Sequence, residues 1–221
     1  MKFNLEVSNE LRQACPNYRG AAVYATVRNT PHSKGLWQEI DAFTRELQAT
    51  ETVDSIKQQT AIVATRDAYR ACGKDPSRYR PSAEALRRRL LRGLDLYQID
   101  TLVDLINLVS LRTGYSIGGF DADKIQGDNL CLGIGKAGEA FEGIGRGTLN
   151  IEGLPVYRDA IGGIGTPTSD HERTKMGIET THILALINGY SGEKGLQEAA
   201  EMTLDMLKKY ADATEGEIVL Y

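Results

Sequence analysis

The stretch "DTLVDLINLVSLRTG", Asp100–Gly114, is the part of the sequence that most clearly decides the fold. Its apolar residues fall on nearly every side of a helix with 3.6 residues per turn, which predicts a buried helix. Asp104 and Asn107 interrupt this helix three positions apart, on one face. An unpaired polar group in such a place costs about 1–3 kcal/mol. The two side chains therefore either anchor the backbone of a neighbouring loop or line a pocket.

Helical patterns dominate before this stretch, and short β-like runs follow it. Ser8 is a predicted N-cap, Gly73 and Gly93 are predicted to end helices, and Asp75-Pro76 looks like a further helix start. The predicted helices cover about 8–15, 33–50, 53–72, 81–93, 100–114 and 193–212, and the predicted strands include 2–7, 20–29, 131–134, 148–151, 155–160, 182–187 and 216–221. We expect an α+β fold with helices packed on a strongly curved, barrel-like mixed or antiparallel sheet. Residues 1–221 are expected to form a single domain, with one lobe or two.

Composition excludes several classes of protein. The chain has 221 residues, of which 41% are hydrophobic and 25% charged, an ordinary balance for a globular protein. No run of apolar residues is long enough to span a membrane, and the N-terminal residues do not resemble a signal peptide. The three cysteines are far apart and there are only three histidines. We therefore expect a cytoplasmic protein without a metal, a cofactor or a membrane partner.

A basic segment stands out against the net charge of −4. The segment from Arg66 to Arg92 contains nine basic residues and three acidic residues. Arg66 and Arg70, like Arg88 and Arg92, align at a spacing of four on a helix, whereas Arg87 and Arg89 point in different directions. Arginine suits bidentate recognition of phosphate. The segment is either an RNA-contacting surface or a solvated helix face with ion pairs to the acidic remainder.

Two glycine-rich segments are candidates for ligand binding. "LCLGIGKAGEAFEGIGRG", Leu130–Gly147, contains G-x-G-x-x-G, but further glycines follow at once, so no helix fits there to hold a dinucleotide phosphate. We interpret these glycines as turns and bulges of a sheet. "DAIGGIGTPTSDHERTK", Asp159–Lys175, combines glycines, hydroxyls and titratable groups, as a site for a small polar ligand does. The alternative is a solvated loop, in which His171 makes only surface ion pairs.

The segment Pro81–Gly127 resembles the tRNA-editing (B3/B4) domain of the bacterial phenylalanyl-tRNA synthetase beta subunit. The residues that keep the register of that family are Pro81, Ser82, Leu86, Arg89, Leu90, Gly93, Val103, Asp104, Asn107, Val109, Gly114, Phe120 and Asp121. "GKAGEAFEGIG" (135–145) and "DAIGGIGTPTSDHERT" (159–174) resemble a turn of the family and its glycine-rich pocket loop. The resemblance covers about 71–189.

The resemblance implies a site that hydrolyses a wrongly attached amino acid from the 3′ end of tRNA, bordered by Asn107 and the loop Gly163–Thr166. Three positions depart from the family: Ile106 replaces its threonine, Gly118 its pocket histidine, and Thr180, next to Glu179, stands near its pocket glutamate. Amino-acid specificity should therefore differ from that of the synthetase. The chain also has no synthetase catalytic domain, so we do not expect a complete aminoacylating enzyme.

These features lead to one hypothesis and its alternatives. The hypothesis is a trans-editing-type deacylase for mischarged aminoacyl-tRNA, with N–H groups of the Gly162–Gly165 loop stabilising the oxyanion and a glycine-rimmed cavity beside Asn107. The alternatives are a non-catalytic RNA- or small-molecule-binding module of the same fold, and a protein with no nucleic-acid role. The expected partner is the aminoacylated 3′ end of tRNA, not DNA, and the sequence does not determine the oligomeric state.

The hypothesis assigns candidate residues to three roles. Candidate catalytic residues are Asn107, Asp170 and His171; substrate-binding candidates are Gly163, Gly165, Thr166, Ser169 and Thr174; RNA-binding candidates are Arg78, Arg80, Arg88 and Arg92.

Overall fold

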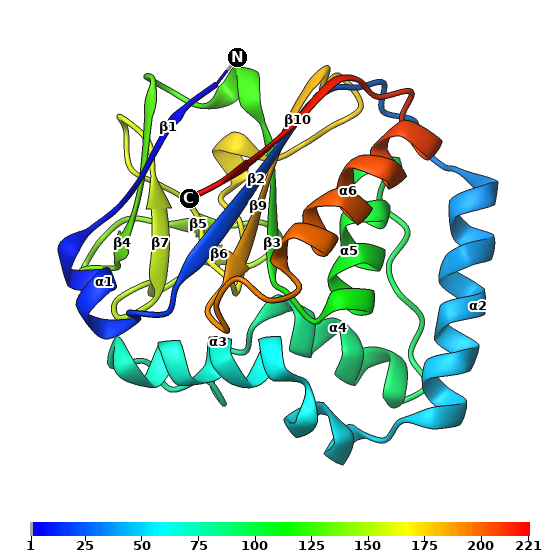
Figure 1. Ribbon diagram of the computed structural model, residues 1–221, viewed down its shortest axis with the longest axis horizontal. Helices are drawn as coiled ribbons and strands as arrows, with labels where there is room; N and C mark the ends of the chain where they lie inside the picture. Colours follow the sequence, from blue (N-terminus) through cyan, green and yellow to red (C-terminus); the bar gives the residue numbers. More distant parts are fainter. Residues whose placement is uncertain (1) are drawn as a thin grey trace.

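The computed structural model describes residues 2–221, which form two four-stranded sheets and one small two-stranded sheet with helices around them (Figure 1). The central sheet has the order β10-β2-β9-β3 and the side sheet the order β1-β4-β7-β8. The strands are β1 Asn4–Val7, β2 Arg19–Thr26, β3 Ile117–Asp121, β4 Asn129–Ile134, β5 Glu142–Gly143, β6 Gly147–Thr148, β7 Pro155–Arg158, β8 Gly163–Gly165, β9 His182–Gly189 and β10 Thr214–Leu220. The α-helices are α1 Asn9–Ala14, α2 Lys34–Thr50, α3 Thr60–Ala71, α4 Ser82–Leu91, α5 Thr101–Thr113 and α6 Leu196–Tyr210, and the 3₁₀ helices are η1 Val53–Gln58, η2 Ala122–Lys124 and η3 Glu172–Thr174.

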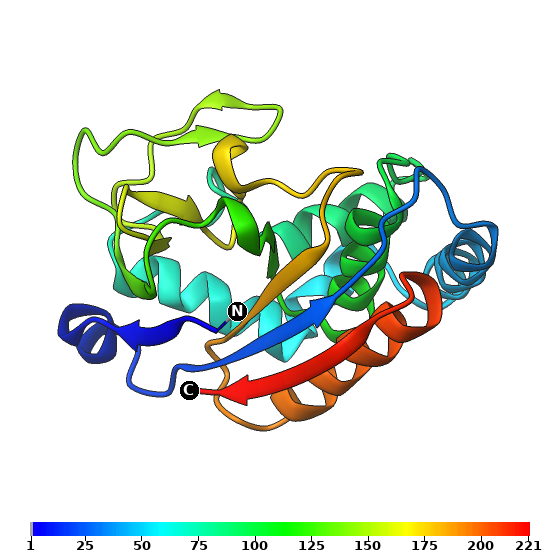
Figure 2. The same cartoon turned by 90° about the horizontal axis from the view of Figure 1, so that it is seen from above.

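The central sheet is buried on both faces, which explains its continuous apolar strands. Side chains alternate across a strand, so Ala21, Val23 and Ala25 of β2 face one core while Ala22 and Tyr24 face another. The first core also contains residues of α2, α5 and α6. The second contains residues of α1 and of the side sheet. Figure 2 shows α5 and α6 on one side of the central sheet.

The expectation of a barrel-like sheet is wrong. Both four-stranded sheets are open: β10 and β3 are the edges of the central sheet, and β1 and β8 are the edges of the side sheet. The pairing within the central sheet is antiparallel, whereas β1 and β4 pair in parallel. The helices and the side sheet already cover both faces of the central sheet, so closure is not needed to bury its apolar residues.

The predicted buried helix is α5, and its ends follow from its caps. Asp100 accepts a hydrogen bond from Val103 N at 2.9 Å, and Gly114 ends the helix in a left-handed conformation with φ of 79°. Asp104 anchors the backbone of a neighbouring loop, the first of the two alternatives that the sequence left open, because its Oδ1 accepts from Ile99 N at 3.1 Å. Its Oδ2 accepts from Trp37 Nε1 of α2 at 2.7 Å.

Of the glycines of the G-x-G-x-x-G segment, Gly138 lies in a turn with a φ of 72°, as interpreted from the sequence, whereas Gly133 lies within β4. No helix follows β4 before β5. Gly135 marks a close approach of two chain segments, since a Cβ atom there would lie 1.9 Å from the carbonyl oxygen of Ile151. The same glycine donates to Leu154 O and accepts from Gly153 N. Its role is therefore structural.

Candidate functional site

The loop that follows β8 is a compact turn held by Thr166. The Oγ1 of Thr166 accepts hydrogen bonds from the N–H groups of Thr168 and Ser169, at 3.2 and 3.1 Å. It also donates to the carbonyl of Ser169 at 3.0 Å. Two contacts from the helices fix the turn from outside: Tyr69 and Thr168 share a hydrogen bond of 2.8 Å, and Ser82 N donates to Pro167 O. The turn therefore has a fixed shape that places Asp170 at its end.

Asp170 lies between the central and the side sheet. Its backbone bridges Gly165 of β8, and its Oδ2 accepts from Gly119 N of β3 at 3.0 Å. Within residues 2–221 its Oδ1 has no hydrogen-bond partner. Burial raises the pKa of this carboxyl to about 7. A half-buried carboxyl group that titrates near neutral pH is suited to general acid–base chemistry.

The glycines around Asp170 leave room for aromatic rings. A Cβ atom at Gly165 would lie 2.5 Å from Phe120 Cζ and 2.7 Å from Asp170 Oδ1, and one at Gly163 would lie 2.9 Å from Phe141 Cδ2. The rings of Phe120 and Phe141 therefore pack directly against Gly165 and Gly163 of β8. Gly118, which the sequence resemblance places at the family histidine, is equally restricted, since a Cβ there would lie 2.7 Å from Phe120 Cζ.

His171 has a local structural contact that restricts its chemistry. Its Nδ1 accepts from Arg173 N at 3.0 Å, and its ring packs edge-on to Phe141 at 5.0 Å between centroids. Burial, together with the nearby Arg173 guanidinium, lowers its pKa. The neutral imidazole then carries its proton on Nε2, so neither nitrogen is free to accept a further proton. Asp170 is thus the better base of the two.

The remaining candidates of this loop are mostly engaged or enclosed. Ser169 Oγ donates to Asp170 O at 3.3 Å, and Thr174 is fully buried with an Oγ1 that has no partner among the described residues. The N–H of Gly162, expected to help stabilise an oxyanion, donates to Asp159 Oδ1 at 3.1 Å. Thr180, near the expected glutamate position, donates to Asp121 Oδ2 at 2.9 Å.

Asn107 is half-buried on α5, and its amide has no hydrogen-bond partner within residues 2–221. The neighbouring Ile106 faces the site more directly: its Cγ1 lies 3.8 Å from the position of a Cβ at Gly119. The two side chains point about 100° apart around the helix. The structure thus brings α5 close to β3, but Ile106 and not Asn107 makes the contact with Gly119.

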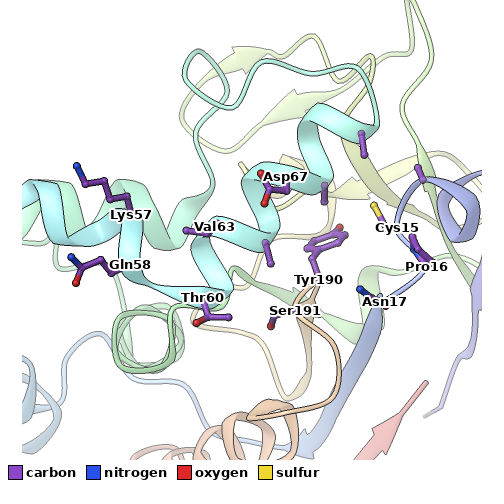
Figure 3. Close-up of a pocket in the computed structure, with 14 residues that line it drawn as sticks. Cys15, Pro16, Asn17, Lys57, Gln58, Thr60, Val63, Asp67, Tyr190 and Ser191 are labelled. Carbon is purple, nitrogen blue, oxygen red and sulfur yellow. The ribbon is translucent and has the colours of Figure 1, made fainter.

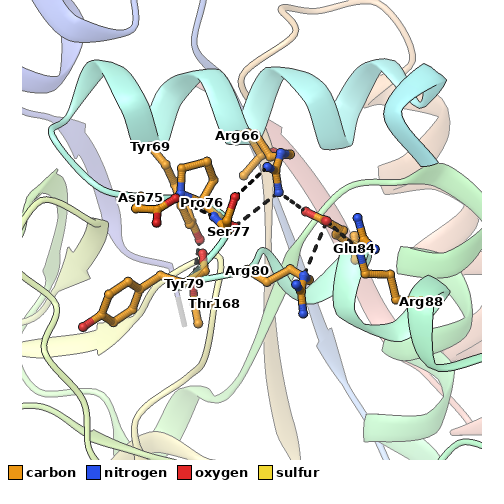
Figure 4. A network of polar contacts seen from close by, with 12 residues as sticks. Arg66, Tyr69, Asp75, Pro76, Ser77, Tyr79, Arg80, Glu84, Arg88 and Thr168 are labelled. Atoms are coloured by element: carbon orange, nitrogen blue, oxygen red, sulfur yellow. Dashed lines mark hydrogen bonds and ion pairs between the residues drawn. The ribbon is translucent and has the colours of Figure 1, made fainter. Parts of the chain in front are cut away.

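The four predicted RNA-binding arginines fall into two groups. Arg78 and Arg92 are exposed and have no ion pair among the described residues. Arg80 and Arg88 pair with Glu84, a carboxylate only 1% exposed, at 3.4 and 2.8 Å (Figure 4). The predicted alternatives, RNA contact and structural ion pair, therefore each describe part of this segment.

Sequence reasoning missed Phe120, Gly119 and Glu84 as parts of these sites. Gly119 and Asp170 are 51 residues apart, so no local spacing relates them. Glu84 is one acidic residue among many arginines, and only its near-complete burial distinguishes it.

The larger pockets are lined by other residues. One of about 610 Å³ lies between the turn after α1, η1, α3 and the end of β9, with Cys15, Asp67 and Tyr190 among its walls (Figure 3). Another, of about 700 Å³, lies beside Lys74 and Lys136. Within residues 2–221 no group of three or more histidine, cysteine, aspartate or glutamate residues could hold a metal ion. No helix in that range is both long and apolar enough to cross a membrane.

Comparison with known proteins gives a family and a structural neighbour. A family model described as "B3/4 domain" matches residues 64–212. No curated protein matches the chain. The fold is similar to the crystal structure of an N-terminal fragment of the phenylalanyl-tRNA synthetase beta-subunit from Pyrococcus horikoshii, with a TM-score of 0.52 and 14% identity. The similarity covers 99% of this chain and 50% of the fragment, so this chain spans about half the length of its neighbour.

Proposed function

Because the chain belongs to the B3/4 domain family, we propose that it binds tRNA and hydrolyses the ester of a mischarged amino acid at the tRNA 3′ end. The solved neighbour is part of a tRNA synthetase subunit, which supports a tRNA-related role. The observation that carries the catalytic part is the Asp170 carboxyl, with a pKa of about 7 and an Oδ1 without a partner among the described residues.

In this mechanism Asp170 acts as a general base. Its ionised Oδ1 accepts a proton from a water molecule, whose oxygen attacks the ester carbonyl of the aminoacyl group. The carbon–oxygen bond to the ribose then breaks, and the departing ribose oxygen takes up the proton that Asp170 accepted, which restores the ionised carboxylate. The products are a free amino acid and a deacylated tRNA. An aminoacyl ester is already activated, so no dedicated nucleophile is needed.

The other candidate residues have supporting roles in the proposal. Thr166 fixes the turn, and Gly163 and Gly165 allow Phe141 and Phe120 to pack beside Asp170. Ser169 and Asn107 are half-buried and can contact the substrate, while Thr174 is buried and His171 holds the segment after the turn by accepting from Arg173 N. Arg78 and Arg92 are the exposed contacts for RNA phosphates.

The test is release of amino acids from a panel of mischarged tRNAs. We expect Asp170→Asn to lower the rate by about 10²–10⁴-fold, the usual contribution of a general base. Asp205→Asn is the matched control, because Asp205 lies on α6 with its side chain 76% exposed. No release above the uncatalysed rate from any tRNA of the panel would refute the enzymatic proposal.

A non-catalytic tRNA-binding module is the second candidate. It is favoured by the rings of Phe141 and Phe120, which leave little room beside Gly163 and Gly165, and by Gly118 in place of the family histidine. For this alternative we expect salt-dependent tRNA affinity without ester release. A protein with no nucleic-acid role would show neither.

A further inference from the structure

A small basic pocket lies between η1, α3 and α4, separate from the Asp170 site. It has a volume of about 290 Å³, and four of its lining residues are cationic: Lys57, Arg66, Arg70 and Arg88. We call it the arginine pocket. Ile56 and Ile62 form part of its apolar wall, and Glu84 is the one acidic residue among those that line it. The lining side chains therefore carry three positive charges in excess.

The buried carboxylate of Glu84 holds two of the arginines that line this pocket. It is 1% exposed, and its two carboxylate oxygens accept from Arg66 Nη1 and Arg88 Nε, both at 2.8 Å (Figure 4). The Nε bond fixes the plane of the Arg88 guanidinium while both of its Nη groups stay without a partner among residues 2–221. A held guanidinium with a free pair of N–H groups is pre-organised for a bidentate anion.

The other two cations lie at the rim of the pocket. Lys57 has no ion pair within residues 2–221. Arg70 pairs with Asp67 through Nη1 only, and this pair is exposed on both sides. Exposed ion pairs contribute little, about 0–1 kcal/mol, so an arriving anion can compete for Arg70.

We propose that the arginine pocket binds a phosphate group. A phosphate carries one or two negative charges and several acceptor oxygens, which match the excess charge and the planar Arg88 donors. The phosphate can belong to an RNA backbone or to a small phosphorylated molecule. The inference does not require ester hydrolysis, because the pocket shares no residue with the Asp170 site.

The test uses rim residues, because removing Arg66 or Arg88 would disturb buried Glu84. The double variant Lys57→Gln/Arg70→Gln removes two rim charges. Lys34→Gln/Arg45→Gln is the matched control, since both residues are exposed on α2 and lose the same charge. Urea denaturation verifies that both variants are folded.

Two probes distinguish the source of the phosphate. Inorganic pyrophosphate is titrated by calorimetry, and a single-stranded RNA of about 12 nucleotides by fluorescence anisotropy at several salt concentrations. We expect at least about tenfold weaker binding of one probe to the rim variant and less than about twofold change in the control, where tenfold corresponds to about 1.4 kcal/mol.

A loss confined to pyrophosphate assigns the pocket to a small phosphorylated molecule. A loss with RNA, and a log–log salt slope smaller by about 1.4 for two lost contacts, assigns it to a backbone phosphate. Equal behaviour of the two variants with both probes, or no binding of either probe to the wild-type protein, would overturn the proposal. Neither readout uses an aminoacyl ester, so this outcome is independent of the deacylase test.

Discussion

At the scale of single residues, Asp170 links stability to pH. Its pKa in the folded protein is about 7, above the ordinary value of 3.8, so the folded state keeps this proton to higher pH than the unfolded chain does. Its contribution to stability is fully present below about pH 4 and is lost as the pH rises through about 7. The slope is at most about 1.4 kcal/mol per pH unit.

We therefore expect Asp170→Asn to remove this slope. The free energy of unfolding from urea titrations between about pH 4 and 8 should fall more steeply with pH in the wild type than in the variant. Parallel curves for the two proteins would mean that Asp170 ionises normally in the folded state.

Gly165 tests the packing beside that carboxyl. A Cβ there would lie 2.5 Å from Phe120 Cζ, whereas a Cβ at Gly162 meets no atom within 4 Å. We expect Gly165→Ala to destabilise the protein by about 1–3 kcal/mol and Gly162→Ala to have little effect. Thermal unfolding of both variants measures the difference. Equal stability would show that the ring can move away at no cost.

At the scale of elements, Glu84 joins α3 to α4. We expect Glu84→Gln to cost about 1–3 kcal/mol, because it leaves the half-buried Arg66, Arg80 and Arg88 without their carboxylate. Asp67→Asn removes only an exposed pair with Arg70 and should cost less than about 1 kcal/mol. Urea denaturation compares the two. A Glu84→Gln variant as stable as Asp67→Asn would mean that solvent already screens this network.

The helices show which elements a sequence predicts well. Ser8 caps α1 as expected, and of Leu36, Ile40, Phe43 and Leu47, whose spacing predicts the buried face of α2, all are buried except Phe43, which is half-buried. The predicted helix over 53–72 is instead η1 and α3, separated at Gln59, whose backbone is extended. The apolar spacing continues across this break, so it could not reveal it.

The predicted helix start at Asp75-Pro76 is also wrong. Asp75 Oδ1 accepts from Ser77 N at 2.9 Å, which closes a turn, and the helix begins at Ser82. Aspartate side chains form both helix caps and such turns. The sequence at this point is compatible with either structure.

At the scale of the whole molecule, the runs of β-forming residues predicted strands but not which strands pair with one another. The parallel pair of β1 and β4 joins Asn4 to Asn129, which are 125 residues apart. The packing of Phe141 against Gly163 and of Phe120 against Gly165 likewise depends on contacts between segments that are distant in the sequence. The α+β class followed from the residues, whereas the open sheets and the Asp170–Gly119 contact did not.

The charge distribution predicts how tRNA binding depends on salt. A basic segment on a chain of net charge −4 gives a local attraction for RNA that salt screens. We expect Arg78→Gln/Arg92→Gln to lower the log–log salt slope of tRNA binding by about 1.4–1.8 and Lys34→Gln/Arg45→Gln to leave it unchanged. Anisotropy titrations at several salt concentrations measure both. Equal slopes would place the RNA contacts elsewhere.

The most direct test of the central claim is the pH dependence of ester release under single-turnover conditions. For the mischarged tRNA that the wild-type protein deacylates fastest, we predict a rate that rises with an apparent pKa of about 7, is lost in Asp170→Asn and is kept in Asp205→Asn. An Asp170→Asn variant that retains the wild-type rate and the same pH profile would contradict it.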